Sequence, residues 1–515
     1  MIGVISKTGE HEVVEEFFQL FKTPWEFYDP GRRHYEVLIA TDDNIPDTDT
    51  ALIVIYGAEK GVLDEGEEIG LGVWVPDLFV KWGDLRVPIY GKAITFSNAE
   101  RPIIFCSKSA KPIGYELRKG EQRILRIGYD LFQEVSFLLT KGQPLENALI
   151  PTLDFHIDML KSWIIETGIK FAEIPPVPAG YEFITCLTHD VDFIGIRRHF
   201  LDHSMGGFLY RATLVSLIDF FRNRASFPKL RENTKAALSL PLVFLGICPD
   251  PWDQFDHYLE LEGGAPSTFF FIPYKNYAGE GFDEKRAKYR AARYDVDDVR
   301  DTIGKILAHG CEVGVHGIDA WHSVERGEKE LRRVREATGQ ENIGIRIHWL
   351  CWKESTFGFL DQAGYQYDSS FGYNETVGFK AGTAQVYKPI GVKRLLELPL
   401  HIQDTALFSP GRMHSAFDHA AHLCDQIIGS VDRYKGVLTL LWHQRSLGPE
   451  RLWGDFYQML IKKLQNKNTW FATAGDVVNW FRARRSARFT PTGEIDAPCP
   501  LKEKAELPYL VLRKY

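Results

Sequence analysis

The fold is decided by the stretch Phe183-Ile184-Thr185-Cys186-Leu187-Thr188-His189-Asp190-Val191-Asp192. An apolar run that ends abruptly in charged residues predicts a parallel strand covered on both faces. The carboxylates of Asp190 and Asp192 are costly to bury without a partner, and a metal ion is one common partner. Because α/β barrels carry their catalytic groups at the carboxyl ends of strands, these aspartates are candidates for an active site. A simple Asx-type turn is the alternative interpretation.

The same pattern recurs further along the chain, where apolar runs end in polar side chains. These runs are 268–272, 312–315 before His316, 343–345 before Arg346 and His348, 395–400 before His401 and Asp404, and 437–442 before His443. Helical patterns, such as 296–309 and 323–337, lie between them. Strands that alternate with helices predict a parallel sheet or barrel, in which the polar groups at the strand exits would meet on one rim.

Residues 1–175 predict a separate N-terminal α/β domain of unknown role. We expect strands at 3–5, 36–40, 51–56, 93–96 and 103–106, and helices at 12–21 and 127–139. The glycines of 66–70 lack the spacing of a phosphate-binding loop. The prolines of 175–178 indicate a boundary, because proline removes backbone donors and stiffens a linker. The barrel is then expected at 181–485 and a C-terminal extension at 486–515.

An insertion around 196–255 interrupts the barrel pattern after its first strand. Apolar residues between 208 and 221 follow helical spacing. The pattern is typical of an insertion packed on the barrel, and it also suits a lid over the active site or a helix on a membrane surface. The three possibilities stay open at this point.

Composition restricts the class of protein. The 515-residue chain has a net charge of −8, so no basic field is available for nucleic acid. No apolar run approaches the length of a membrane span, although peripheral membrane contact is compatible with the sequence. The seven cysteines form no Cys-x-x-Cys pair, which argues against a thiolate zinc site or a disulfide framework. The first residues predict a strand and not a signal peptide, so we expect a cytoplasmic protein.

Taken in order, the motifs resemble those of the polysaccharide deacetylases, carbohydrate esterase family 4. The similar segments are Thr188-His189-Asp190-Val191-Asp192, Ser267-Thr268-Phe269-Phe270, Glu312-Val313-Gly314-Val315-His316, Arg346, Gly364-Tyr365-Gln366-Tyr367-Asp368-Ser369-Ser370 and Leu438-Thr439-Leu440-Leu441-Trp442-His443. The resemblance covers 181–485. It implies an α/β fold, namely a distorted (β/α) barrel of the polysaccharide deacetylase type preceded by the small α/β domain.

The resemblance also implies catalytic roles. Asp190 would be the general base, oriented by Arg346, and His443 would be the general acid, supported by Asp404. Hydrolysis of an N-acetyl amide needs an activated water molecule and a proton for the departing amine. An imidazole near its free pKa can supply that proton.

The resemblance further implies a divalent metal, with Zn²⁺ the expected ion, bound by Asp192 and His316. The family's usual second motif is His-Ser/Thr-x-x-His, but here an alanine replaces the second histidine and His322 lies two residues later. We therefore predict His322 as the third ligand, with Asp319 as the competing residue. The next candidates are His348 and His401.

The sequence thus favours a metal-dependent hydrolase that removes an N-acetyl group from an amino sugar or glycan precursor, in surface polysaccharide biosynthesis. A metal-independent amidohydrolase acting on a small non-sugar amide and a non-catalytic glycan-binding protein are the alternatives. Trp321, Trp349 and Trp352 lie beside the motifs and suit either sugar stacking or core packing. The sequence does not specify the sugar or the oligomeric state.

Overall fold

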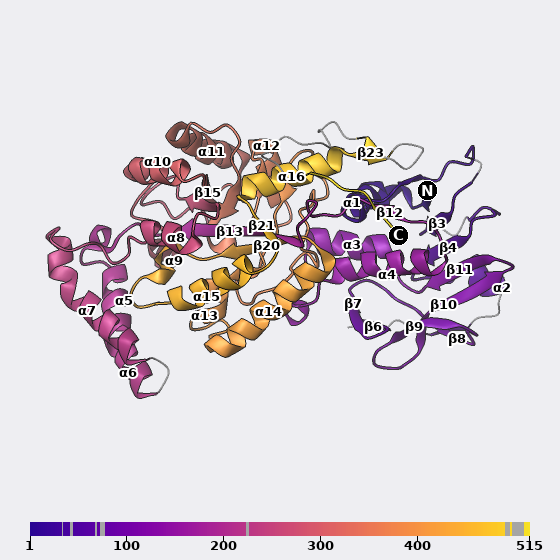
Figure 1. The fold of residues 1–515 in the computed structure, drawn as a ribbon, viewed down its shortest axis with the longest axis horizontal. Coiled ribbons are helices and arrows are strands. Elements are labelled where there is room, and N and C mark those ends of the chain that lie inside the picture. The colour runs from indigo at the N-terminus through magenta and orange to yellow at the C-terminus, as the bar shows by residue number, and fades with distance from the viewer. Residues whose placement is uncertain are drawn as a thin grey trace.

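Two nine-stranded sheets form the framework of the chain in the computed structural model (Figure 1). The structure describes residues 1–32, 34–41, 45–66, 70–72, 78–222, 226–489, 495–496 and 509–515. The glycine segment 66–70, which lacks the spacing of a phosphate-binding loop, therefore lies partly outside the described residues. Within the described part, no helix is both long and apolar enough to cross a membrane.

The first sheet is parallel in one half and antiparallel in the other. Its order is β2 (Trp25–Phe27), β1 (Ile2–Ile5), β3 (Val37–Ala40), β4 (Leu52–Tyr56), β11 (Gln122–Ile127), β10 (Pro112–Lys119), β9 (Pro102–Cys106), β6 (Leu78–Trp82) and β7 (Leu85–Ile89). Strands β2 to β11 pair in parallel, and β11 to β7 pair antiparallel. The accompanying helices are α1 (His11–Phe21), α2 (Val62–Gly66), α3 (Leu131–Thr140) and α4 (Thr152–Glu166).

The second sheet is parallel throughout. Its order is β18 (Leu396–Glu397), β17 (Tyr367–Asp368), β16 (Ile345–Ile347), β15 (Glu312–Gly317), β14 (Ser267–Phe271), β13 (Phe183–Val191), β20 (Val437–Leu441) and β19 (Ile402–Gln403), while β21 (Thr469–Phe471) also pairs with β13. Helices α8 (Phe255–Glu262), α10 (Arg300–Ala308), α11 (Val324–Thr338), α12 (Thr356–Ala363), α14 (Phe417–Tyr434), α15 (Gly454–Gln465) and α16 (Ala474–Ser486) lie around it. The predicted parallel α/β sheet is confirmed.

The sheet is curled but does not close into a full barrel. Among the described strands, β18 and β19 do not pair with each other. The segment that connects β18 to β19 forms backbone hydrogen bonds with other strands. The amide of Leu398 donates to the carbonyl of Asp368, and the amide of His401 donates to the carbonyl of Thr439. The two short strands are therefore tied to opposite edges of the gap, and the fold is a half-barrel.

Alternation along β13 explains which side chains face the site. His189 points away, because its Nδ1 lies 2.9 Å from the carbonyl oxygen of Trp442 and its Nε2 lies 2.8 Å from Oε1 of Glu262. Successive side chains in a strand point to opposite faces, so Thr188 and Asp190 lie on the other face. His189 thus anchors the strand, and Asp190 is free to serve the site.

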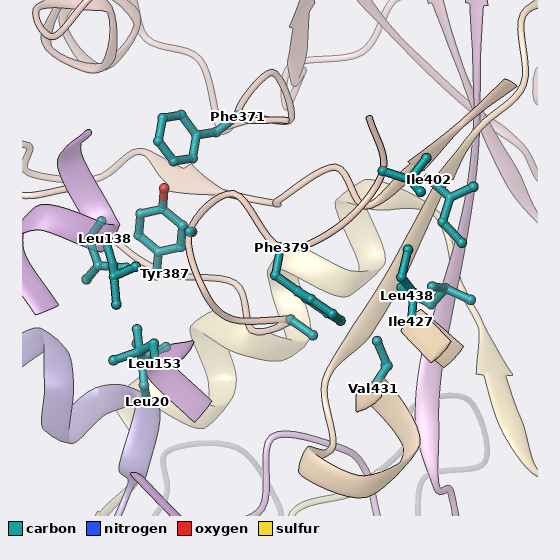
Figure 2. Packing of buried hydrophobic residues seen from close by; sticks show 14 of the residues in the cluster. Leu20, Leu138, Leu153, Phe371, Phe379, Tyr387, Ile402, Ile427, Val431 and Leu438 are labelled. Carbon is teal, nitrogen blue, oxygen red and sulfur yellow. The ribbon is translucent and has the colours of Figure 1, made fainter. Parts of the chain in front are cut away.

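The two sheets are joined by one continuous apolar cluster. Leu20, Leu138 and Leu153 from the first half pack near Phe379 and Tyr387 of the second half (Figure 2). The C-terminus returns to the first half, where β24 (Arg513–Lys514) pairs antiparallel with β12 (Ala172–Glu173). Contacts join the three predicted segments 1–175, 181–485 and 486–515 to one another. The division of the chain into these segments therefore stays a prediction.

The insertion forms a projecting helical hairpin, seen beside α8 and α9 (Glu284–Arg290) at the end of the molecule away from the chain termini (Figure 1). We call it the arm and define it as residues 196–247. It contains α5 (His203–Tyr210), the π-helical turn Arg211–Val215, α6 (Ser216–Phe221) and α7 (Phe227–Phe244). Its inner faces pack on Ile196 and Trp252.

We expect Arg484→Met to lower the free energy of unfolding by about 3 kcal/mol, measured by chemical denaturation, because buried groups lose their hydrogen bonds. The guanidinium is buried and donates to the backbone carbonyls of Ile174, Gln19 and Leu20 at 2.8 to 2.9 Å. The control is Arg300→Met, an exposed arginine paired with Asp297, which should change stability by under about 0.5 kcal/mol. Equal effects would contradict the prediction.

Candidate functional site

The polar side chains predicted at strand exits lie along the carboxyl edge of the second sheet. Asp190 is next to last in β13, His316 lies near the end of β15, and Arg346 is the middle residue of β16. Asp404 directly follows β19, and His443 follows β20 after one intervening residue. Parallel strands bring these segments of sequence together at one edge, which is where α/β proteins place their chemistry.

Three ligand atoms converge at this edge. Oδ1 of Asp192 lies 3.2 Å from Nε2 of His316 and 3.2 Å from Nδ1 of His348. The two imidazole nitrogens are 2.9 Å apart. Among the described residues, these three side chains form a group of the kind that can hold a metal ion.

The hydrogen bonding of this group fits a cation. Nδ1 of His316 donates to the carbonyl oxygen of Arg346 at 3.0 Å, so Nε2 keeps its lone pair. Oδ1 of Asp192 is buried and accepts no hydrogen bond of acceptable geometry. A cation between the three atoms would satisfy an otherwise unpaired carboxylate oxygen and both imidazoles. Two imidazoles and one carboxylate are a donor set that suits zinc.

The electrostatics support the same interpretation. Burial acts to raise the pKa of the Asp192 carboxyl, but His348 and His316 outweigh burial and hold this pKa well below its usual range. Burial also lowers the pKa of His348 to about 4, against the opposing effect of Asp192. At neutral pH the group therefore offers one carboxylate and a neutral imidazole from His348, which are the protonation states that bind a metal.

His322, predicted as the third ligand, does not join this group. Its Nε2 lies 3.1 Å from Oδ1 of Asp319. Asp319 is itself engaged by the Tyr277 hydroxyl at 2.5 Å and by the amide of Glu280. The chain turns away after β15 because Glu330 accepts hydrogen bonds from two backbone amides there, including that of Asp319.

His348 stands where His322 was expected. Strands β15 and β16 are adjacent and parallel, with His316 opposite Arg346, so a residue just beyond β16 lies beside the end of β15. The backbone at Trp349 then turns with φ of 66°, in the left-handed region. The available signal in the sequence was a histidine two positions after a strand-end arginine. His401, the other reserve candidate, is buried near the backbone of Thr383 and Thr439.

Arg346 fixes Asp190. The buried guanidinium donates to Oδ1 of Asp190 at 3.4 Å and to Oγ1 of Thr188 at 2.7 Å. It also donates to the carbonyl and the hydroxyl of Ser369, each at 2.7 Å. Sequence reasoning assigned no role to Thr188 or Ser369, although both lie in the quoted motifs. Oδ2 of Asp190 lies 3.9 Å from Nε2 of His316.

His443 and Asp404 form a second buried pair. Nδ1 of His443 lies 2.6 Å from Oδ1 of Asp404, whose other oxygen accepts from the His443 backbone amide at 2.8 Å. Burial acts to lower the pKa of His443, but the charge and hydrogen bond of Asp404 outweigh it and raise this pKa above its usual value. Nε2 faces Asp192, 3.8 Å from Oδ2. The raised pKa favours a protonated imidazole, whose Nε2 faces the group formed by Asp192, His316 and His348.

Two arginines flank this pair. Arg451 donates to Oγ of Ser446 at 3.0 Å, and Arg412 donates to Oγ1 of Thr405 at 2.7 Å. Both hydroxyl-bearing residues also donate to Asp404, through the Ser446 hydroxyl and the Thr405 amide. Within the described part of the chain, neither guanidinium has a carboxylate within ion-pair distance. Positive charge is therefore available beside the site.

No protein-family model matches the chain, and no curated protein matches it. Among solved structures, a Mycobacterium smegmatis protein assigned as a polysaccharide deacetylase is 18% identical with a TM-score of 0.37, covering 60% of this chain and 95% of its own. Puue allantoinase is 14% identical with a TM-score of 0.35, covering 60% and 93%. A Pseudomonas aeruginosa PAO1 protein assigned as a polysaccharide deacetylase is 15% identical with a TM-score of 0.34, covering 60% and 94%.

Two of these three proteins are assigned as polysaccharide deacetylases. Their identity and structural overlap with this chain are low. The chemistry of the chain therefore has to be established from its own residues.

We expect His348→Ala to weaken zinc binding by at least about tenfold, because it removes one of the converging nitrogens. Zinc content after dialysis against a competing chelator measures this effect. His322→Ala is the matched control, since His322 bonds Asp319 outside the group, and it should retain its zinc. If His322→Ala loses zinc and His348→Ala keeps it, the ligand set predicted from the sequence is correct instead.

Proposed function

We propose that this chain is a metal-dependent hydrolase that removes an N-acetyl group from an amino sugar or glycan precursor. One observation carries the proposal. A group of metal-ligand type and a His–Asp proton donor lie on opposite oxygens of Asp192, with Asp190 beside them. Amide hydrolysis needs these parts together: an activated water, a base to deprotonate it and an acid for the leaving amine.

Each side chain then has a defined task. A divalent ion held by Asp192, His316 and His348 would polarise the amide carbonyl and make a water molecule more acidic. Asp190 accepts the proton of the attacking water, and Arg346 keeps the carboxylate aimed at it. As the new C–O bond forms and the C–N bond breaks, His443 gives its proton to the departing nitrogen. The products are acetate and a free amino group.

Features beside the site favour a sugar substrate. Trp349 keeps 39% of its surface exposed, although His348, the residue before it, is buried. Its ring centroid lies 5.7 Å from that of His348, which is close enough to offer an apolar platform to a ring bound at the site. Trp352 instead packs on Phe357 and Phe371. Trp321, like Trp352, is partly buried against the hydrophobic core, so Trp349 is the exposed member of the three tryptophans named from the sequence.

The two arginines beside Asp404 favour an acidic substrate. Arg412 and Arg451 donate to hydroxyl groups and form no direct ion pair with a carboxylate among the described residues, so they can attract an anion. A precursor whose sugar carries phosphate meets this requirement. Such precursors are used in building surface polysaccharides, which is the setting proposed here.

We expect the purified enzyme to release acetate from an N-acetylated amino sugar, to lose this activity in a strong chelator, and to regain it with added Zn²⁺. Acetate release, measured by an enzyme-coupled assay, reports turnover. Asp190→Asn is the control for catalysis, because it should abolish turnover while zinc content is retained. Full turnover without metal would favour the metal-independent amidohydrolase. Sugar binding that persists without turnover under every condition would favour the glycan-binding alternative.

The pH dependence tests His443 as the acid. His443 must be protonated to act, so activity should fall as pH rises through its raised pKa, giving an alkaline limb above pH 6.5. Asp404→Asn removes the charge that raises this pKa and should move the limb to lower pH. His443→Ala should reduce turnover by about 10²–10⁴-fold. Plots of kcat/KM against pH measure the position of the alkaline limb and the loss of activity. Zinc content is measured in each variant to check that the metal is retained. An alkaline limb that stays at the same pH in Asp404→Asn would contradict the assignment of His443 as the general acid.

A further inference from the structure

The arm exposes an unusual amount of apolar surface. Of 21 large apolar side chains that are exposed in the described part of the chain, 12 lie between residues 200 and 247. Phe221 and Leu238 keep 75% and 76% of their surface exposed. Apolar side chains exposed singly are ordinary, but a concentration of this kind marks a surface that binds something.

These side chains form stripes along both helices of the arm. Tyr210, Leu214, Leu217 and Phe221 are exposed at intervals of three or four residues. The stripe on α7 changes character along its length, from basic residues to leucines. Its members are Arg231, Lys235, Leu238, Leu242 and Leu245. Helices with apolar and basic stripes are typical of segments that lie in a membrane interface.

The exposure does not come from a loosely packed arm. The opposite faces of its helices are buried in a core of their own, which contains Phe208, Ala212, Ala236, Leu240, Val243 and Trp252. The buried Asn233 donates to Oγ of Ser216 at 3.1 Å and ties the two helices together. The arm has thus placed one set of apolar side chains inside and left a second set outside.

The net charge of the arm indicates which kind of partner binds its exposed apolar surface. The described residues of the arm, 196–222 and 226–247, contain seven Lys or Arg and three Asp or Glu, a net charge of +4 in a chain whose total is −8. Two arms facing each other would oppose like charges. The other exposed large apolar residues are scattered over separate elements, so a second copy offers no matching patch. An anionic lipid surface matches both the apolar and the basic side chains.

We propose that the arm binds the surface of an anionic lipid bilayer, with its apolar stripes in the interface and its basic residues on the headgroups. The arm is fixed to the catalytic edge. Arg211 pairs with Glu450 at 2.9 Å, and the Glu450 amide donates to Asn233 at 2.7 Å. Glu450 belongs to the segment that follows His443, so docking holds the site close to the membrane. This inference goes beyond the proposed function and does not depend on it.

Sedimentation with vesicles tests the proposal. We expect the full chain to bind vesicles of equal parts phosphatidylglycerol and phosphatidylcholine at least about tenfold more tightly than vesicles of phosphatidylcholine alone. Binding should weaken in high salt, because headgroup charges are screened. The assay contains no acylated sugar and measures no turnover, so its failure would leave the catalytic proposal standing.

Two variants test the apolar and the basic side chains of the arm separately. The triple variant Leu214→Ser, Leu217→Ser and Phe221→Ser, and the double variant Arg231→Glu and Lys235→Glu, should each lose at least about tenfold in vesicle affinity. The matched control changes exposed apolar residues outside the arm. It combines Leu145→Ser, Ile165→Ser and Met459→Ser and should bind as the parent does.

Circular dichroism checks that each variant is folded. Vesicle binding that is equal for the arm variants and the control would overturn the proposal. Light scattering tests the alternative that a second copy of the chain covers the arm. A parent chain that is dimeric, with a monomeric triple variant, would also overturn it and assign the surface to a second copy.

Discussion

The cost of placing two carboxylates at the end of a buried strand governs the second half of this chain. An unpaired buried carboxylate costs several kcal/mol, so Asp190 and Asp192 require partners. Asp190 is paired with the buried Arg346, and Asp192 faces His316 and His348. These partners come from β15, β16 and the turn after it, which explains why those strands lie next to one another and end together. The same need for a partner leaves Asp192 suited to a cation.

The partners are themselves held by backbone groups, and this makes the geometry of the site dependent on the sheet. His316 donates to the carbonyl of its neighbour in the ladder, Arg346, while the amide of His443 donates to Asp404. Side chains fixed by strand backbones have little freedom to move, which is the requirement for a preorganised site. The sheet need not close for this purpose, because each link spans adjacent or nearby strands.

Much of this arrangement follows from local sequence. Apolar runs predicted the strands, and the residues that end them predicted Asp190, Arg346 and His443 at one edge. The third converging ligand was not predictable in this way. His322 contacts Asp319 and lies apart from the group, and Glu330 of α11, the next helix along the chain, holds the backbone after β15. Barrel closure likewise depends on two-residue strands, whose pairing carries almost no sequence signal. Local patterns therefore predicted strands and their ends, while contacts between distant segments decided the rest.

The arm adds an exposed apolar surface close to the site, which the site residues themselves do not explain. Its helices separate buried from exposed apolar residues, and the packing of the helices on one another and on Trp252 determines which residues are buried. The ion pair between Arg211 and Glu450 links the arm to the segment after His443. A substrate carried on lipid would meet such a site by diffusion in two dimensions, at a raised local concentration. Recognition of the carrier surface and catalysis on the sugar would then reside in separate parts of one chain, so each can change in sequence without loss of the other.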